Sequence, residues 1–362
     1  MLIPTPNLSQ NQSAMEFSVR LPPPVPFPSD INTASLVHVS LEKLLTGDNQ
    51  ESAELFEACK KAGFFLLDLQ NVPLGETLMD DADALMALSE ELFAMELEEK
   101  LKYRMPKGGF SGYKGIGMLR IDEKGTPDRC EFFGVLKDEL LGISPVFNQP
   151  AVIEAHKELC ISFTKKAHEL ALIILANLEK SLHLPSGTFD SLHRISEPSH
   201  DQTRLIRYPP QPASDRRTSF VAHTDFGSVT VLFNILGGLQ ILPNISTNDY
   251  HCIPSSSSSA WQFVRPVPGF AIINIGDAMT KFTNDLLRSG LHRVTSAPGD
   301  QGNVVRTSLA YFLRPENEVL MRRLEGGDVI PGLEEGRVEE GVVKSGEWVG
   351  VKGEGKKIGG EE

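Results

Sequence analysis

The chain has 362 residues, of which 40% are hydrophobic and 7% aromatic, and its 48 acidic against 35 basic side chains give a formal net charge of −13. This size and composition are typical of a globular protein of one or two domains, and the negative charge disfavours nucleic acid and anionic membranes as partners. Its four scattered cysteines form no CxxC pair, which argues against a disulfide framework or a cysteine zinc site and favours a reducing, cytoplasmic setting.

Composition divides the chain into four regions, and no apolar stretch in them is long enough to span a bilayer. Residues 1–34 are rich in proline and predict an extended arm. Residues 35–200 have mostly helical patterns, and residues 201–324 contain a series of short strand-like segments. Residues 325–362 are rich in glycine and acidic side chains, which predicts a flexible or loosely attached tail. We expect the two middle regions to form one compact domain.

Helical periodicity is clear at three places in the first half. A helix over 51–62 is expected to end at Gly63, followed by a short apolar strand over 64–67. A second helical region covers 76–104, and the longest covers 151–182. In the longest region, one apolar face recurs at spacings of three and four residues: Leu159, Phe163, Ala167, Leu170, Ile174 and Leu178.

The second half changes from helical to strand-like patterns. Short β-type segments between Pro, Gly and Asn turns are predicted at 203–208, 228–234, 238–242, 261–264, 270–275, 291–296 and 306–312. Many closely spaced strands favour a sandwich or barrel over a parallel sheet. A serine-rich insertion at 244–260 is expected to form a loop outside this core. The predicted fold class is therefore α+β, with a β-sandwich core buttressed by long helices.

The first cluster with chemical potential is His223-Thr224-Asp225. Residues i and i+2 of a strand point to the same face, so the imidazole and the carboxylate can converge on one cation. His292, at the start of another predicted strand, is the expected third ligand. Two histidines and one carboxylate leave coordination positions open, as non-haem Fe(II) requires, although ligand identity alone does not exclude zinc.

The second cluster is Arg306-Thr307-Ser308, on the next predicted strand after His292. On a strand, Arg306 and Ser308 face the same way and offer a guanidinium and a hydroxyl to one carboxylate. A carboxylate bound there could have its other end on the metal.

Taken in order along the chain, these clusters resemble the isopenicillin-N-synthase-like branch of the 2-oxoglutarate- and Fe(II)-dependent dioxygenases. The matching segments of the strand-rich half are Arg207-Tyr208-Pro209-Pro210, His223-Thr224-Asp225-Phe226-Gly227, Gly238-Leu239-Gln240, Pro266 to Gly269, Asn274-Ile275-Gly276-Asp277, Leu291-His292-Arg293-Val294 and Arg306-x-Ser308. Those of the helical half are Ala62-Gly63-Phe64-Phe65, Leu97-Glu98-Glu99-Lys100 and Gly112-Tyr113. The resemblance covers about residues 35 to 318.

The resemblance implies a double-stranded β-helix, or jelly roll, flanked by N-terminal and buttressing helices. It implies Fe(II) at the two histidines and the aspartate named above, with O2 as oxidant and 2-oxoglutarate held by Arg306, Ser308 and Tyr208. Members of the family couple decarboxylation of 2-oxoglutarate to succinate and CO2 with hydroxylation, desaturation or ring formation on a substrate. The chemistry is iron-centred, and no separate acid or base is assigned.

Two other readings stay open, and one of them rests on a departure from the family pattern. The segment Ile206-Arg207-Tyr208-Pro209 resembles isopenicillin N synthase itself, which uses no 2-oxoglutarate and binds its substrate's carboxylate with the Arg-x-Ser pair. This segment makes an Fe(II) oxidase that uses O2 without 2-oxoglutarate one alternative. A separate alternative is a non-catalytic small-molecule-binding protein that kept the fold, against which the retention of every ligand type weighs.

The family places its substrate between the mouth of the jelly roll and the terminal segments. Here this implies a pocket lined by Phe110, Tyr113, Met118, Arg120, Phe133, Phe226, Phe312 and Arg314. Aromatics with an occasional arginine suit a mostly apolar small molecule bearing a polar or acidic group. Such a substrate is compatible with secondary metabolism, and the sequence gives no indication of the oligomeric state.

Overall fold

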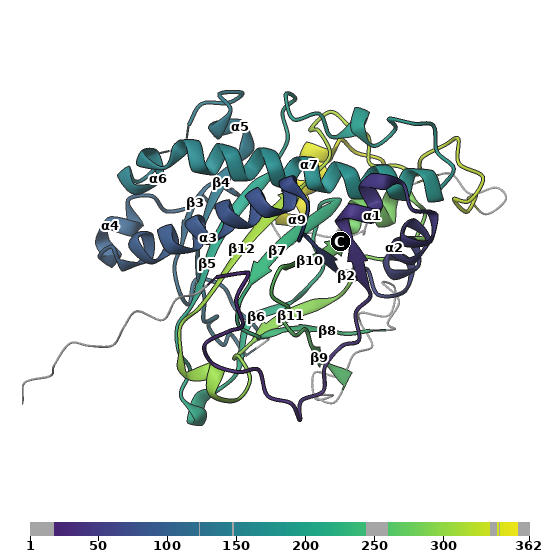
Figure 1. Cartoon of the computed structure of the whole chain (residues 1–362). Helices are drawn as coiled ribbons and strands as arrows, with labels where there is room; N and C mark the ends of the chain where they lie inside the picture. Colours follow the sequence, from purple (N-terminus) through teal and green to yellow (C-terminus); the bar gives the residue numbers. More distant parts are fainter. Residues whose placement is uncertain are drawn as a thin grey trace, which may run out of the picture.

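Two β-sheets face each other in the protein, seen in a computed structural model that describes residues 18–122, 124–146, 148–243, 260–333, 339 and 341–353 (Figure 1). The larger, eight-stranded sheet has the spatial order β1 (His38–Ser40), β2 (Phe64–Asp68), β10 (Phe270–Ile275), β7 (Val229–Asn234), β12 (Arg306–Leu313), β5 (Gln202–Tyr208), β4 (Glu131–Leu136) and β3 (Gly112–Lys114). The smaller one has the order β6 (Thr218–His223), β11 (His292–Thr295), β8 (Leu239–Ile241) and β9 (Gln262–Phe263). Within both sheets the strand pairs are antiparallel except for β1 with β2.

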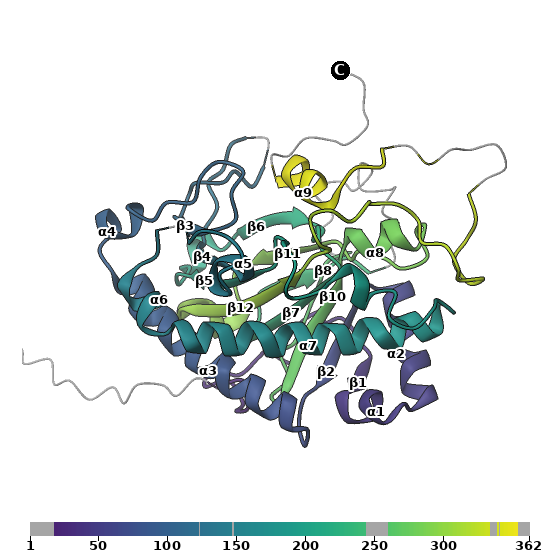
Figure 2. The ribbon, with the colours of Figure 1, turned by 90° about the horizontal axis from the view of Figure 1, so that it is seen from above.

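Helices cover the outer face of the large sheet (Figure 2). The described α-helices are α1 (Leu41–Thr46), α2 (Asn49–Lys61), α3 (Pro73–Ala94), α4 (Leu97–Leu101), α5 (Lys137–Leu140), α6 (Ala151–Ala155), α7 (Lys157–Ser181), α8 (Asp277–Phe282) and α9 (Ser345–Gly353). The apolar stripe predicted for the longest helix is buried in α7 from Phe163 to Leu178, against the sheet. None of the helices within the described ranges has the length and apolar character needed to cross a membrane.

Two of the predicted helices are interrupted. The region expected over 76–104 divides into α3 and α4, because Met95 and Glu96 adopt extended backbone angles between them. The region expected over 151–182 divides into α6 and α7 at His156, whose ψ of 24° leaves the helical range. The predicted strand positions correspond to β2, β5 and β7 to β12, whereas β1, β3, β4 and β6 were not predicted.

The C-terminal region is more firmly attached than its composition suggests. Residues 345–353 form α9, in which Trp348 is 7% exposed and Val349 is fully buried in the main hydrophobic core. Two apolar side chains thus anchor a segment that is otherwise polar and glycine-rich. The serine-rich insertion, apart from Ala260, and residues 354–362 lie outside the described residues.

Alternation along the strands of the large sheet separates the core from a pocket between the two sheets. On β12, one set of side chains packs in the helix-covered core: Leu309, Tyr311 and Leu313. The alternate set lines the pocket: Arg306, Ser308, Ala310 and Phe312. On β5 the pocket-lining set is Arg204, Ile206 and Tyr208. Every second side chain of these two adjacent strands therefore points into the pocket between the large sheet and strands β6 and β11.

Candidate functional site

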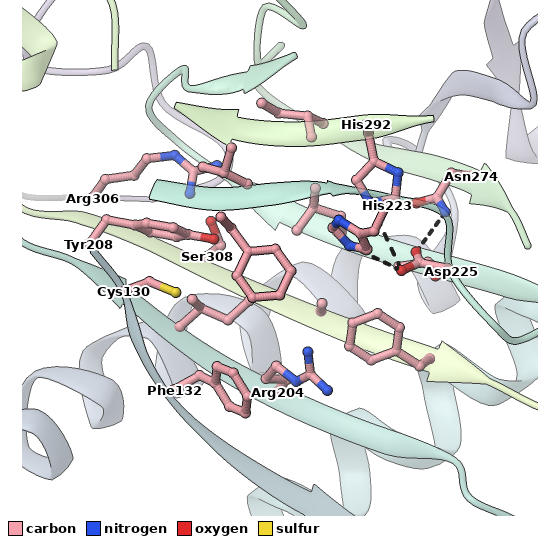
Figure 3. A pocket seen from close by; sticks show the side chains of 18 of the residues that line it. Cys130, Phe132, Arg204, Tyr208, His223, Asp225, Asn274, His292, Arg306 and Ser308 are labelled. Atoms are coloured by element: carbon pink, nitrogen blue, oxygen red, sulfur yellow. Dashed lines mark hydrogen bonds and ion pairs between the residues drawn. The ribbon is translucent and has the colours of Figure 1, made fainter. Parts of the chain in front are cut away.

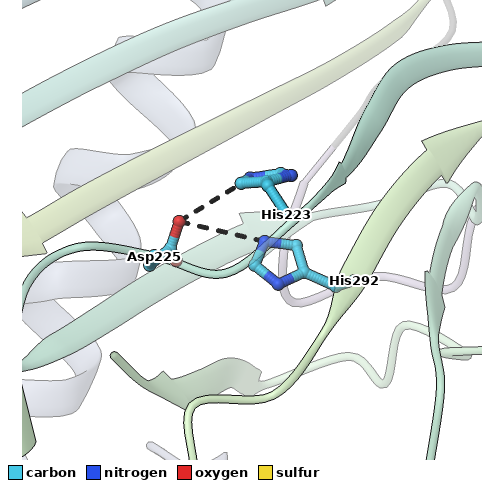
Figure 4. Close-up of side chains that lie close together, drawn as sticks. All are labelled: His223, Asp225 and His292. Atoms are coloured by element: carbon cyan, nitrogen blue, oxygen red, sulfur yellow. Dashed lines mark ion pairs between the residues drawn. The ribbon is translucent and has the colours of Figure 1, made fainter. Parts of the chain in front are cut away.

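His223, Asp225 and His292 come together at the edge of the small sheet, with Asp225 in the turn that follows β6 (Figure 4). His223 ends β6 and His292 begins β11, and the two residues are direct partners in the antiparallel pairing. Asp225 Oδ1 lies 3.7 Å from His223 Nε2 and 3.9 Å from His292 Nε2. One ligand atom from each side chain falls within 4.8 Å of the others, which is a spacing that one metal ion can bridge.

Hydrogen bonds from the ring nitrogens to backbone carbonyl groups orient both imidazoles. His223 Nδ1 lies 2.8 Å from the Val221 carbonyl oxygen, and His292 Nδ1 lies 3.0 Å from that of Gly290. A carbonyl can only accept, so each Nδ1 carries a proton, and in a neutral ring that binds metal the lone pair is on Nε2. Both lone pairs are on the ring edge nearest Asp225, as metal ligation requires.

Two side chains fix the carboxylate of Asp225. Thr230 Oγ1 and Asn274 Nδ2 each donate a 2.7 Å hydrogen bond to its Oδ2, which leaves Oδ1 facing the histidines. Figure 3 shows the bond from Asn274. The turn that carries Asp225 packs tightly, because a Cβ on Gly276 would lie 2.1 Å from the Gly227 carbonyl oxygen. The sequence motif around Asn274 pointed to this segment, but its amide was not identified as a support for the carboxylate.

The protonation states of His223 and Asp225 also favour the binding of a cation. Desolvation and the neighbouring His292 lower the pKa of His223 to about 4. Burial alone would raise the pKa of Asp225, but the two histidines and the hydrogen bonds from Asn274 and Thr230 lower it to about 2. At neutral pH the cluster therefore presents a neutral His223 and an ionised Asp225.

Asn274→Ala should weaken metal binding about 10- to 100-fold without removing any proposed ligand. The physical reason is that Asp225 Oδ2 would lose one of its two donors, which frees the carboxylate to rotate. The measurement is a competition titration of Fe(II) or Mn(II) against a chelator. Thr230→Ser, which keeps the hydroxyl donor, is the matched control, and equal affinities for Asn274→Ala and the wild type would contradict the prediction.

Arg306 and Ser308 lie in the same chamber as these three residues. Arg306 is 3% exposed, its Nε donates to the Gly237 carbonyl oxygen at 2.6 Å, and its guanidinium carbon lies 4.6 Å from the centre of the Tyr208 ring. Its Nη1 and the Ser308 hydroxyl are buried and have no hydrogen-bond partner among the described residues. Buried donors without partners are costly, so this end of the chamber fits an anionic acceptor such as a carboxylate.

The pocket has two connected parts. The inner chamber is lined by the residues described above together with apolar side chains. The outer chamber opens to solvent, and both parts share a common boundary: Phe132, Arg204, Phe220, His223, Asp225 and Phe312. Of the expected substrate-pocket residues, six line the outer chamber: Phe110, Tyr113, Met118, Phe226, Phe312 and Arg314.

Two expected pocket residues lie elsewhere, and several lining residues were not expected. Phe133 is 1% exposed in the main core, because it is the neighbouring Phe132 of β4 that faces the pocket. Arg120 is exposed and donates to the Gly125 carbonyl oxygen at 3.2 Å. The lining residues that the sequence did not single out include Arg204 and Phe220, which border both chambers.

Comparison with protein families gives two consecutive matches. Residues 36–148 match the model described as non-haem dioxygenase in morphine synthesis N-terminal, and residues 199–315 match the 2OG-Fe(II) oxygenase superfamily. A 2-oxoglutarate-dependent dioxygenase of Aspergillus fumigatus is 36% identical over 90% of this chain and 87% of its own length. The 2-oxoglutarate-dependent dioxygenase frbH of a Dothideomycetidae species is 32% identical, covering 83% of this chain and 88% of its own.

Solved structures share the fold. A full-length protein from Neurospora crassa, in complex with alpha-KG, superposes with a TM-score of 0.69 at 21% identity, covering 88% of this chain and 95% of that chain. A putative 2OG-Fe(II) oxygenase family protein from Caulobacter crescentus gives the same TM-score at 22% identity, covering 88% and 98%. These structures confirm the predicted α+β jelly-roll fold, and the family models and the curated relatives confirm the family resemblance.

Proposed function

The chain belongs to the 2OG-Fe(II) oxygenase superfamily, and we propose that it oxidises a small organic molecule at an iron held by His223, Asp225 and His292. It is an Fe(II)- and 2-oxoglutarate-dependent dioxygenase that uses O2. One observation supports the residue assignment most strongly. The cluster of His223, Asp225 and His292 lines the same chamber as the donors of Arg306 and Ser308 that have no hydrogen-bond partner among the described residues.

Each side chain has a defined task under this proposal. His223, Asp225 and His292 would hold Fe(II), which with 2-oxoglutarate would supply the activation of O2. Arg306 and Ser308 bind the distal carboxylate of 2-oxoglutarate, and Tyr208 packs against the guanidinium and keeps it in place. The apolar walls exclude water from the reacting groups.

The substrate would enter through the outer chamber, whose aromatic lining suits a small, mostly apolar molecule. We place this molecule in secondary metabolism, in keeping with the morphine-synthesis description of the N-terminal family model. Hydroxylation, desaturation and ring formation are all open to such a site.

Anaerobic addition of Fe(II) and then 2-oxoglutarate should produce a metal-to-ligand charge-transfer absorption band. Glutarate is the matched control, because it keeps both carboxylates but lacks the keto group needed for chelation, and it should give no band. Admission of O2 should then consume 2-oxoglutarate and release succinate in equal amounts. If iron is bound but 2-oxoglutarate gives no band, the proposed site is wrong, and 2-oxoglutarate-independent O2 consumption would favour the oxidase alternative.

A further inference from the structure

Two arginines pack against one phenylalanine in the outer chamber. Arg204 on β5 and Arg314 just after β12 have guanidinium carbons 4.8 Å and 5.3 Å from the centre of the Phe312 ring. Each also lies on a second aromatic, Arg204 at 4.3 Å from Phe132 and Arg314 at 5.1 Å from Phe110. The rings fix both guanidinium groups at the wall of the chamber.

Neither guanidinium has an anionic partner among the residues that the structure describes. Arg204 Nη2 donates to the neutral amide oxygen of Gln202 at 2.8 Å, and Arg314 Nη1 donates to the backbone carbonyl of His200. The nearby Asp201 accepts a 2.7 Å hydrogen bond from the backbone N–H of Arg314. The Nε atoms of both arginines are buried without a hydrogen-bond partner.

Such an arrangement is costly in the free protein. Arg314 is only 4% exposed, and burial lowers its pKa to about 10, so it is still charged at neutral pH. A buried cation without a counter-ion is destabilising, and a bound anion would offset that cost. Arg204 lines both chambers and Arg314 the outer one, so both arginines border the space that a substrate would occupy.

The outer chamber as a whole is positive, although the chain carries −13. Its lining contains five cationic side chains: Arg104, Lys107, Lys114, Arg204 and Arg314. Lys114 pairs with Asp128. Among the described lining residues, the one carboxylate is that of Asp225, which the proposed function assigns to iron. The local potential therefore attracts an anion.

We propose that the substrate is a small organic carboxylic acid whose carboxylate binds Arg204 and Arg314. This inference rests on the proposed function and names the substrate class of that site. Planar guanidinium groups match the planar carboxylate, and 2-oxoglutarate is already accounted for by Arg306 and Ser308. The apolar body of the acid would contact Phe312 and Met118, of which Met118 is 37% exposed at the mouth.

The test is binding of matched acids and amides to the Fe(II) protein with saturating 2-oxoglutarate, by calorimetry without O2. The probes are acetate, octanoate and 3-phenylpropionate, each paired with its primary amide, and 2-phenylethylphosphonate. The larger carboxylates should bind at least about tenfold more tightly than their amides, because a charge-assisted hydrogen bond is lost in the amide. They should also bind more tightly than the phosphonate.

Arg204→Gln and Arg314→Gln should each weaken acid binding about tenfold or more and leave amide binding within about twofold. Arg204→Lys and Arg314→Lys keep the charge and should retain part of the preference, which provides a test if a glutamine variant does not fold. The matched control is Arg322→Gln, which removes an exposed arginine outside both chambers.

Equal binding of acids and amides, failure of every acid to bind, or tighter binding of the phosphonate would overturn the proposal. So would arginine variants that weaken acid and amide equally, because the arginines would then only support the aromatic walls. The charge-transfer band separates this failure from failure of the proposed function. A normal band with no acid preference rejects the substrate class alone, whereas loss of the band rejects the metal and co-substrate site.

Discussion

His223→Ala and Asp225→Ala should each abolish stable iron binding and lower succinate formation by more than about 100-fold. Each variant removes one of three atoms that converge within 4.8 Å, and two protein ligands on an open site hold Fe(II) weakly. The loss should exceed the 10- to 100-fold effect expected for a hydrogen-bonding support such as Asn274. Iron per protein chain after desalting, and succinate released per unit time, are the two measurements.

His156→Ala is a suitable control for this experiment. His156 is exposed between α6 and α7, its Nδ1 lies 2.9 Å from the Val152 carbonyl oxygen, and it lines neither chamber. It should keep wild-type iron content and turnover. Full turnover in either the His223 or the Asp225 variant would reject the assignment of the metal ligands.

The metal cluster could be predicted because its signal is chemical and local. An HxD pair needs only the i, i+2 geometry of extended backbone, and the third ligand is named by the ordered motifs around His292. The sequence could not show that His223 ends β6, because that strand was not predicted. Its burial pattern does not alternate clearly, and it contains Ala222 and a partly exposed Val221. The direct pairing of His223 with His292 depends on the tertiary structure and could not be predicted from the local sequence.

The pocket walls were harder to predict because they depend on which of the two faces of the sheet each strand residue points to. Phe132 and Phe133 are adjacent on β4, and a shift of one residue exchanges the pocket face for the core face. Nothing local decides between two neighbouring phenylalanines. Arg204, in contrast, could have been found, because counting back by twos from Tyr208 along a predicted strand leads to it. Its stacking on Phe312 comes from another strand and could not be predicted in this way.

The C-terminal tail, residues 325–362, shows what average composition cannot predict. A glycine- and acid-rich segment predicts loose attachment on average, yet α9 is held because Trp348 and Val349 fit into the main core. Two side chains barely alter a composition average over 325–362. Whether they are buried depends on a receiving surface built from other parts of the chain, which the segment itself does not encode.

Arg306→Gln should raise the 2-oxoglutarate concentration needed for half-maximal charge-transfer absorbance by about 100-fold, while iron content stays normal. The guanidinium is 3% exposed, and its Nη1 has no hydrogen-bond partner in the described part of the chain, so a bound carboxylate would receive a desolvated, charge-assisted hydrogen bond. Ser308→Ala removes a neutral donor from the same wall and should have a smaller effect, about tenfold or less.

Arg306→Lys tests whether geometry as well as charge matters at this position. Arg306 Nε donates to the Gly237 carbonyl oxygen at 2.6 Å, and the guanidinium packs on Tyr208, so its free edge is held in a fixed direction. Lysine keeps the charge but has neither the Nε donor nor the planar edge, and we expect an affinity between those of wild type and Arg306→Gln. Arg322→Gln, which changes an exposed arginine away from the pocket, should leave the titration unchanged. If Arg306→Gln left the 2-oxoglutarate requirement unchanged but impaired binding of the substrate acid, the Arg-x-Ser pair would hold the substrate carboxylate, as in the oxidase alternative.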